Sequence, residues 1–386
     1  MNIFIKLLFI IFIFFYIFYN SHHQSHSIIS NLPHKILRAG SNKSYSNYYS
    51  KNTKINDNHL VLKISCDILK NKYNINIFYK ITDYTIQIYY NNKYIRFKHG
   101  YNNLKRKFFY KNNKVSISNK LKKYNFPVPK NQIINKIQTI NHINYIINNL
   151  NISYPLVIKP VDGNNAYNVF TNISNNYQLK NILINKFLNK KLKRCKVCNI
   201  MLEEHLYGNQ YRILMYKNYI LDITQLIPPY IIGDGINSIK HLIFIENNKQ
   251  INKKYPLIID KHFLQVKNLN INSILNKGQK FIINLPKGRL GCFYKRINIK
   301  NIHKDNITMF KKLYKIAGFD FIGVDFIINN LHLSYKHYTN KHSGINELNS
   351  SPSIATHYYS KGLTPNYNVP INFLIHYFKI NKQTLF

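Results

Sequence analysis

Asp325–Pro352 read DFIINNLHLSYKHYTNKHSGINELNSSP, and this stretch decides the predicted fold and its chemistry. Asp325 ends an apolar run that predicts a buried strand, and INELN predicts a second strand with Glu347 and Asn349 two residues apart. Residues two apart on a strand point to the same face, so an acid on a neighbouring strand can converge on them. Carboxylate and amide oxygens suit Mg²⁺, which also takes oxygens from a bound phosphate. The same residues are equally compatible with ordinary acids at strand ends.

The composition describes a folded and strongly basic chain. Its 386 residues are enough for about two or three compact units, and a hydrophobic fraction of 45% excludes wholesale disorder. The 55 basic against 14 acidic residues give a formal charge of +41, which ordinarily indicates nucleic acid or an anionic membrane surface as a partner. However, Lys, Asn, Ile, Tyr and Phe are all abundant, Trp is absent, and the lysines are scattered along the chain. We therefore favour a drifted composition over a dedicated nucleic-acid surface.

The four cysteines do not make a disulfide framework in a chain of this length. Cys195 and Cys198 form one CxxC motif, without a second pair or a nearby histidine at zinc-finger spacing. A reduced loop in a cytosol-like compartment is the favoured interpretation, and metal or redox use of the pair stays open.

The N-terminus carries a long apolar run. Residues 1–20 are mostly Ile, Leu and Phe, a length between a signal-peptide core and a membrane anchor. Residues 21–58 are rich in Ser, Asn, His and Lys, which predicts a disordered basic linker or an acid-poor organelle transit segment. The basic flank after the apolar run favours a cytoplasmic main body, with or without a membrane anchor at residues 3–19. Cleavage or retention of residues 1–20 stays open.

Residues 59–107 predict a small α/β cap domain in front of a larger domain, 108–380. HLVLKISCDILKNKY has the apolar spacing of an amphipathic helix. NINIFYKIT, YTIQIYY and KYIRFKHG read as strands, with Asn91 and Asn92 at a hairpin turn.

Four motifs follow one another in the larger domain: YPLVIKPVDGNN, IMLEEHLYGNQYRILM, LIPPYIIGDGINSIKHLI and INELNSSPS. In this order they resemble the ATP-grasp ligases, and within that superfamily the cyanophycin synthetase-like proteins, over roughly Phe108–Leu363. The most specific piece is PPYIIGDG followed by NSIKHLI. The resemblance implies an α+β fold in which two lobes clasp ATP between antiparallel sheets, with the small cap in front.

The resemblance implies that two lysines hold the nucleotide phosphates. Lys114 opens a predicted helix that ends before FPVP, and Lys159 ends the apolar strand of YPLVIKP. The following loop contributes backbone N–H groups to phosphate in the family, because glycine lacks a Cβ that would intrude. Gly163 is present in this loop, whereas Ala166 and Asn168 stand where related enzymes usually have glycine. A stiffer loop with a weaker grip on the γ-phosphate is the expected consequence.

The second motif resembles the adenine-binding linker of the family. Glu203 and Glu204 match its acid pair, and Leu206 lies where backbone groups bond to the base. The ribose hydroxyls are usually held by a carboxylate, but this sequence has Gln210, which still forms hydrogen bonds without a charge.

Three arginines are the candidate catalytic residues. Arg212 resembles an arginine that contacts the substrate, and it suits bidentate binding of a carboxylate or acyl phosphate. Arg289 and Arg296 are candidates for stabilising a tetrahedral intermediate. Gln225 and Leu226 stand where the family often has arginines, so one phosphate contact is expected to be missing.

The predicted function is an ATP-dependent carboxylate–amine ligase that forms an amide bond through an acyl phosphate. One or two Mg²⁺ ions, or Mn²⁺ in their place, are expected on Asp325, Glu347 and Asn349. The substrates are expected to be a small carboxylate and an amine, with an amino acid or peptide among them; the oligomeric state stays open. One alternative is a degenerate protein that binds nucleotide without turnover, favoured by the departures at the glycine loop and Gln210. The other is a basic nucleic-acid or membrane-surface binding protein, for which the charge is the sole support.

Overall fold

The computed structural model describes residues 56–82, 84–98, 100–101, 114–161, 168–188, 199–248, 257–284, 293–338, 342–358 and 368–381. The apolar run at residues 3–19, the pair Cys195 and Cys198, Gly163 and Arg289 therefore lie outside the described residues. Within the described ranges, every helix is too short or too polar to span a bilayer.

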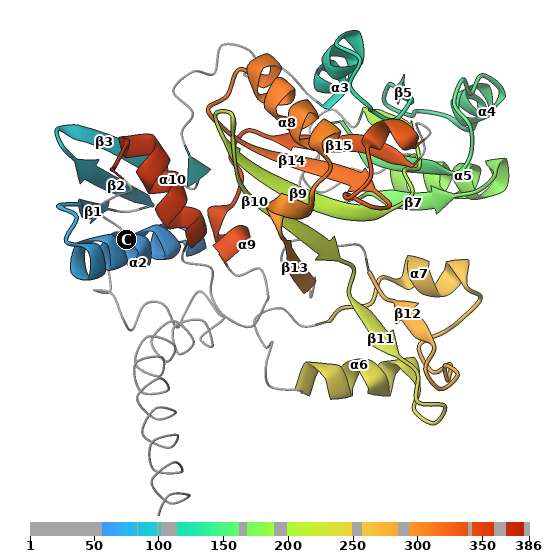
Figure 1. The fold of residues 1–386 in the computed structure, drawn as a ribbon. Helices are drawn as coiled ribbons and strands as arrows, with labels where there is room; N and C mark the ends of the chain where they lie inside the picture. Colours follow the sequence, from blue (N-terminus) through green and yellow to red (C-terminus); the bar gives the residue numbers. More distant parts are fainter. Residues whose placement is uncertain are drawn as a thin grey trace, which may run out of the picture.

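The N-terminal unit is a helix packed on a small antiparallel sheet (Figure 1). Its elements are α2 (Asp57–Tyr73), β1 (Phe78–Thr82), β2 (Thr85–Tyr90), β3 (Lys93–Lys98) and β4 (Gly100–Tyr101). The Asn56 side chain accepts a hydrogen bond from the His59 backbone N–H and starts α2. Asn91 and Asn92 both have positive φ, which confirms the hairpin turn predicted between β2 and β3.

The C-terminal helix α10 (Asn368–Phe378) completes this unit. Phe373 of α10 is fully buried, and its ring lies 5.8 Å from Phe97 of β3. The same ring lies 4.9 Å from Phe321 and 5.3 Å from Tyr216, both in the large central sheet described below. One apolar core therefore joins the cap, the chain end and the central sheet.

A second unit is built on a four-stranded antiparallel sheet in the order β5-β8-β6-β7. Its strands are β5 (Asn131–Ile134), β6 (Leu156–Pro160), β7 (Phe170–Ile173) and β8 (Ile200–Glu204). Its helices are α3 (Lys114–Lys123), α4 (Ile140–Asn148) and α5 (Asn176–Ile182), the last continued by a π-helical turn at Leu183–Phe187. Alternate residues of β6 and β8 pack on α4 and α5, as the period of two in a strand requires.

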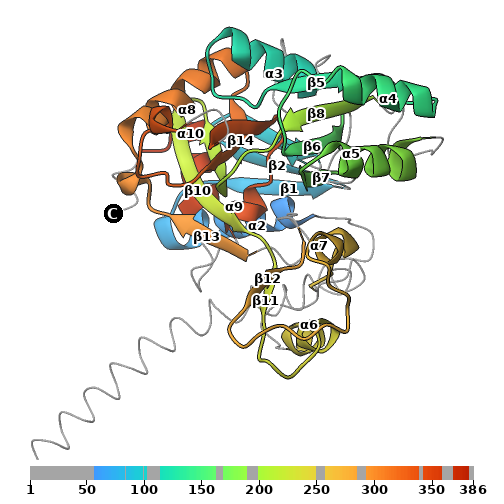
Figure 2. The ribbon, with the colours of Figure 1, turned by 90° about the vertical axis from the view of Figure 1, so that its right-hand side faces the viewer.

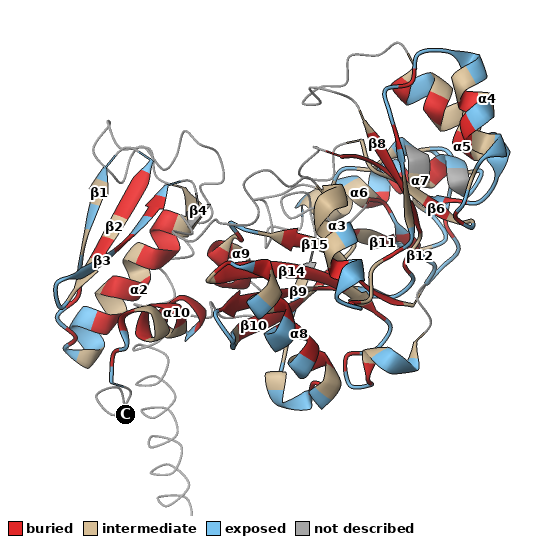
Figure 3. Ribbon diagram, turned by 90° about the horizontal axis from the view of Figure 1, so that it is seen from above, coloured by how far each residue is buried: buried red, intermediate tan, exposed pale blue. Residues whose placement is uncertain are grey.

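The central sheet has five antiparallel strands in the order β13-β10-β9-β14-β15. They are β9 (Asn209–Tyr216), β10 (Tyr219–Ile227), β13 (Phe293–Ile297), β14 (Phe321–Ile328) and β15 (Ser343–Asn349). One face packs on α8 (Lys304–Ala317), where Phe310 meets Phe326 edge to face at 5.5 Å. Figure 3 shows buried residues along β9 and β14 in the middle of this sheet. The short helix α9 (Ile354–Tyr358) follows β15, and 3₁₀ turns lie at Ile299–Asn301 and Tyr335–His337.

A small unit is inserted between β10 and β13 and projects from the central sheet (Figure 2). It consists of β11 (Tyr230–Ile232), α6 (Ile239–Asn248), α7 (Lys261–Val266) and β12 (Lys280–Ile282), packed around a core of their own. The GDG segment at Gly233–Gly235 forms a turn before α6, in which Asp234 accepts a hydrogen bond from the Ile236 N–H and Gly235 has φ +80°. Hydrogen bonds from the backbone N–H groups of Asn237 and Ile236 lower the pKa of Asp234 to about 2.

These antiparallel sheets with their helices confirm the α+β class. The predicted helix at Lys114 is also confirmed, and it ends at Lys123, just before Asn125 takes a left-handed φ of 59°. The boundaries predicted for the domains stay predictions, and the packing of α10 against α2 and β3 adds a later segment of the chain to the cap.

Replacing Phe373 tests whether α10 holds the cap to the central sheet. We expect Phe373→Ala to lower the free energy of unfolding by about 3–5 kcal/mol, because it opens a cavity where three elements meet. Phe244→Ala on α6 is the control, since that ring is 60% exposed, and its cost should stay within about 0.5 kcal/mol. Denaturant-induced unfolding measures both, and a loss below about 1 kcal/mol for Phe373→Ala would contradict the shared core.

Candidate functional site

A row of polar side chains crosses the five-stranded sheet from edge to edge. In register, Glu347 of β15 lies opposite Asp325 of β14, and Asp325 lies opposite Arg212 of β9. Arg212 lies opposite Thr224 of β10, which lies opposite Arg296 of β13. Residues directly opposite one another in a sheet share a face. The row therefore lies on the face turned away from α8, because the neighbouring residues Ile213 and Val324 pack toward that helix.

A second row on the same face supports the first. Asn349, Gly323, Leu214 and Asp222 are opposite one another on successive strands. The Asn349 side chain donates a hydrogen bond of 3.3 Å to Asp325 Oδ2. A Cβ on Gly323 would lie 2.8 Å from Cβ of Pro352, so the turn after β15 sits directly on this glycine. The structure thus brings Asp325, Glu347 and Asn349 together, as the spacing in the sequence predicted.

Arg212 holds Asp325 by a two-pronged contact. Its Nη2 donates to Asp325 Oδ2 at 2.8 Å, and its Nε donates to Oδ1. Asp325 is 2% exposed, so the guanidinium compensates a buried carboxylate. Burial opposes the charged form of Arg212, but the Asp325 carboxylate outweighs it and raises the pKa of this guanidinium. The arginine expected to hold a substrate carboxylate is therefore already bound to a carboxylate of the protein.

Lys114 lies beside Glu347, with Nζ 4.0 Å from Oε1. The contact arises because the segment after α3 runs along β15, where the Ile345 N–H donates to the Pro127 carbonyl at 2.8 Å. A lysine at the start of α3 is thereby brought from the second unit to the row on the central sheet.

Lys159 and Glu203 form a separate buried ion pair in the second unit. Lys159 Nζ lies 2.5 Å from Glu203 Oε2, and the two side chains are 8% and 4% exposed. They come from the neighbouring strands β6 and β8. Two buried opposite charges at this distance offset much of the cost of removing each from water.

Glu204 has a different environment from Glu203. Its Oε1 accepts hydrogen bonds from the backbone N–H and the hydroxyl of Ser153, at 3.1 and 2.7 Å. Adjacent residues of a strand point to opposite faces. The sequence motif predicted one shared role for the two acids, whereas in the structure Glu203 contacts Lys159 and Glu204 contacts Ser153.

The linker after β8 packs against the start of β15. Leu206 is buried, and its side chain would lie 2.9 Å from a Cβ on Gly344. The Tyr207 ring stacks on His342 at 5.4 Å and meets His205 edge to face at 5.0 Å. Burial lowers the pKa of His205, which favours its neutral form. This contact brings the predicted adenine-binding linker against the central sheet.

Gln210 lies on the same face as the row. It is two residues before Arg212 on β9 and lies opposite Ile327 of β14.

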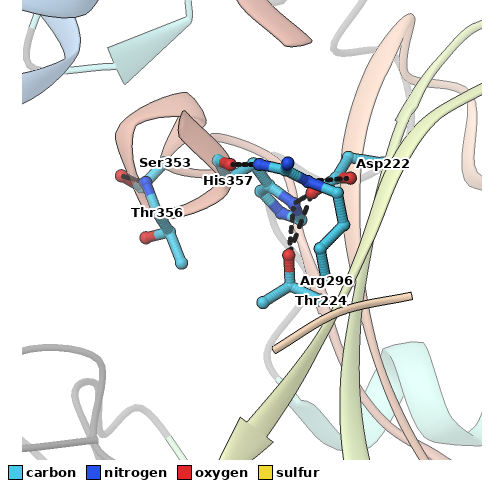
Figure 4. Close-up of polar contacts among 6 residues, drawn as sticks. All are labelled: Asp222, Thr224, Arg296, Ser353, Thr356 and His357. Carbon is cyan, nitrogen blue, oxygen red and sulfur yellow. Dashed lines mark hydrogen bonds and ion pairs between the residues drawn. The ribbon is translucent and has the colours of Figure 1, made fainter. Parts of the chain in front are cut away.

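Three residues beside Arg296, namely Asp222, Thr224 and His357, were not predicted from the sequence (Figure 4). Asp222 Oδ2 accepts from the Thr224 hydroxyl at 2.9 Å and lies 2.8 Å from His357 Nδ1. Asp222 Oδ1 lies 3.4 Å from Arg296 Nε. Asp222 had one available signal, an acid inside the apolar strand YILDI of a chain that has few acids. His357 had none, because its contact depends on how α9 folds back over β10.

The donor set at Asp325, Glu347 and Asn349 has two carboxylates and one amide. Groups of three or more His, Cys, Asp or Glu residues suited to a metal ion are absent from the part of the chain that the structure describes. A transition-metal site of that kind is therefore missing there, whereas hard oxygen donors with a phosphate are the usual environment of Mg²⁺.

No family model matches the chain. Curated relatives do: it is 26% identical over 232 residues to the cyanophycin synthetase of Crocosphaera subtropica, covering 56% of this chain and 25% of that protein. It is 25% identical over 265 residues to the cyanophycin synthetase of Synechocystis, covering 64% of this chain and 28% of that protein. The glutathione biosynthesis bifunctional protein of Clostridium perfringens is 27% identical over 172 residues, 41% of this chain and 21% of its own.

Among solved structures, the bifunctional glutathione synthetase of Pasteurella multocida superposes with a TM-score of 0.51 and 18% identity, covering 86% of this chain and 46% of that one. The expected fold is thereby confirmed: the chain has the ATP-grasp fold and is similar to cyanophycin synthetase. It spans about a quarter of the length of the curated relatives that it matches.

Removing the Arg212 guanidinium tests its hold on Asp325. We expect Arg212→Met, without added metal, to lower the free energy of unfolding by about 3–5 kcal/mol, because a buried carboxylate loses its counter-charge. Adding Asp325→Asn to this variant should recover about 1–2 kcal/mol, since the uncompensated charge is removed.

The matched control is Arg96→Met on the exposed side of β3, with an expected change within about 0.5 kcal/mol. Chemical denaturation in the presence of a chelator measures all four proteins. Equal losses for Arg212→Met and Arg96→Met would show that the pair does not stabilise the sheet.

Proposed function

We propose that the chain is an ATP-dependent carboxylate–amine ligase that forms an amide bond through an acyl phosphate. The observation that carries the proposal is the row from Glu347 to Arg296, which sets two carboxylates beside two arginines on one face of an ATP-grasp sheet. Cyanophycin synthetase and glutathione synthetase, which the chain resembles, support the reaction class.

The proposed nucleotide contacts come from both sheets. Lys159 grips the phosphates from β6, where Glu203 keeps its ammonium in place inside the fold. Lys114 reaches them from the start of α3, close to Glu347. The linker from Glu204 to Leu206 lines the base, and Gln210 bonds to the ribose. Gly163 belongs to the same proposal, although it lies outside the described residues.

Asp325, Glu347 and Asn349 would hold one or two Mg²⁺ ions. Two carboxylates directly opposite each other on neighbouring strands repel, and a divalent cation between them removes that cost. Arg212 occupies only part of the Asp325 carboxylate, which has about four lone-pair sites for its two oxygens. When bound, Mg²⁺ neutralises charge on the β- and γ-phosphates and orients the γ-phosphate for attack.

The arginines of the row act on the carboxylate substrate. Arg212 uses Nε and Nη2 for Asp325, and a guanidinium has about five N–H donors, so others remain for a substrate oxygen. A substrate carboxylate held there attacks the γ-phosphorus, and the bond to ADP breaks. The amine then attacks the acyl carbon and phosphate leaves, while Arg296 stabilises the oxyanion that forms. Positioning supplies most of the rate in this scheme.

The substrates are proposed by class only. An amino acid or peptide acceptor follows from the likeness to cyanophycin synthetase, of which this chain spans about a quarter.

Glu347→Gln tests the nucleotide site. We expect this neutral variant to weaken Mg²⁺-dependent binding of ATP by at least about tenfold, roughly 1.4 kcal/mol, because a hard ligand is lost at constant shape. Glu246→Gln on α6 is the matched control and should bind as the wild type does. Titration calorimetry with and without Mg²⁺ measures the affinities.

Release of ADP across a panel of amino acids and dipeptides then tests ligation by the wild type. Mg²⁺-dependent ATP binding with no ADP release for any acceptor would favour a protein that binds without turnover. If the Glu347→Gln variant binds Mg·ATP as tightly as the wild type does, the assignment of Glu347 as a metal ligand is wrong.

A further inference from the structure

Arg296 is held from two sides by groups that the proposed chemistry does not use. Its Nε lies 3.4 Å from Asp222 Oδ1, and its Nη2 donates to the backbone carbonyl of His357 at 3.4 Å. About 30% of the Arg296 side chain stays exposed, whereas its Nε atom is buried. Figure 4 shows it lying across Asp222 and His357.

The partners of Arg296 are themselves buried. Asp222 is 3% exposed and His357 is 0% exposed. Asp222 Oδ2 accepts a hydrogen bond from the Thr224 hydroxyl and also contacts His357 Nδ1. Because a carboxylate oxygen only accepts hydrogen bonds, the hydrogen between Oδ2 and Nδ1 is carried by the imidazole. The pair therefore fixes both the tautomer of His357 and the orientation of the Asp222 carboxylate.

His357 reaches this position because α9 is fixed to the cap. Asn58 near the start of α2 accepts from the Ala355 N–H at 3.0 Å and from the Ser353 hydroxyl at 3.1 Å. Tyr358 is fully buried in a small apolar cluster with Val61 of α2. α9 follows shortly after β15 in the chain. One short segment therefore contains the candidate metal ligands Glu347 and Asn349 and also His357, which contacts Arg296.

We infer that Asp222 and His357 are positioning residues that hold Arg296 on the row with Arg212. The inference rests on the proposed ligase function for its kinetic consequence. Thr224 completes the arrangement, since it lies between the two arginines on β10 and donates to Asp222. A buried carboxylate and a buried imidazole are costly to keep where an apolar pair would fill the same space, and their use in orienting the partly exposed Arg296 side chain accounts for that cost.

A double-mutant cycle tests the positioning. His357→Gln should lower kcat by about tenfold to a hundredfold, the loss expected when a reacting group moves by about 1 Å, and leave KM for ATP within about twofold. When His357→Gln is added to Arg296→Lys, kcat should fall by less than about a further twofold, because His357 acts through Arg296. Asp222→Asn should behave like His357→Gln. Fully additive losses would overturn the inference.

The control is His376→Gln on α10, a histidine whose ring stacks on Tyr219 at 4.1 Å. It removes an imidazole without touching Asp222 and should leave kcat unchanged. A loss for His376→Gln equal to that for His357→Gln would show a general effect on packing and would also overturn the inference.

A spectroscopic readout decides the positioning without turnover. In protein labelled with ¹⁵N-arginine, the Nε–H signal of Arg296 is identified by its absence in Arg296→Lys. We expect its exchange with water to be at least about tenfold faster in Asp222→Asn and His357→Gln than in wild type and His376→Gln, because the guanidinium is released. An unchanged exchange rate in Asp222→Asn would overturn the inference. If the wild type releases no ADP but the exchange rates are as expected, the proposed ligase function is rejected and the positioning of Arg296 by Asp222 and His357 is supported.

Discussion

The contact between Arg212 and Asp325 on neighbouring strands is the interaction on which the candidate site depends. The period of a strand is two residues, so a slip of β14 by one residue against β9 would turn Asp325 toward the apolar face packed on α8. A carboxylate buried there without a partner would be strongly unfavourable. The ion pair therefore stabilises the one register that also places Glu347 and Asn349 beside Asp325.

Strand alternation divides the central sheet into two different surfaces. One surface carries Ile213, Val324 and Phe326 and packs on α8, which makes the sheet rigid. The other carries the charged row, and its cations lie beside its carboxylates instead of facing water alone. Rigid elements hold functional groups more precisely than loops do. A triphosphate with a metal ion needs such precision, because phosphoryl transfer depends on alignment more than on covalent chemistry by the protein.

The parts of this site that the sequence predicted are local ones. Glu347 and Asn349 share a face because of their spacing. Lys114 lies at the start of a helix whose end is marked by Asn125 and the FPVP segment. The contacts that the sequence did not predict join distant segments. Arg212 and Asp325 are separated by 113 residues, and only the strand order brings them together. The acids Glu203 and Glu204 illustrate the same limit, because their roles diverge with the face that each occupies.

The scarcity of acids turns out to be the most informative property of the composition. A chain with 14 acidic and 55 basic residues has many surface cations whose pairing is worth little. Four of its carboxylates, those of Glu203, Glu204, Asp222 and Asp325, are nevertheless almost completely buried. Each is held by specific donors: a lysine, a serine, a histidine with a threonine, and an arginine. Burying a carboxylate is costly unless such partners are present. A general drift of the composition toward basic residues therefore does not account for these four buried and paired carboxylates. An acid inside an apolar strand of a basic chain is therefore a stronger indication of a functional site than the net charge, and by this criterion Asp222 belongs with Asp325.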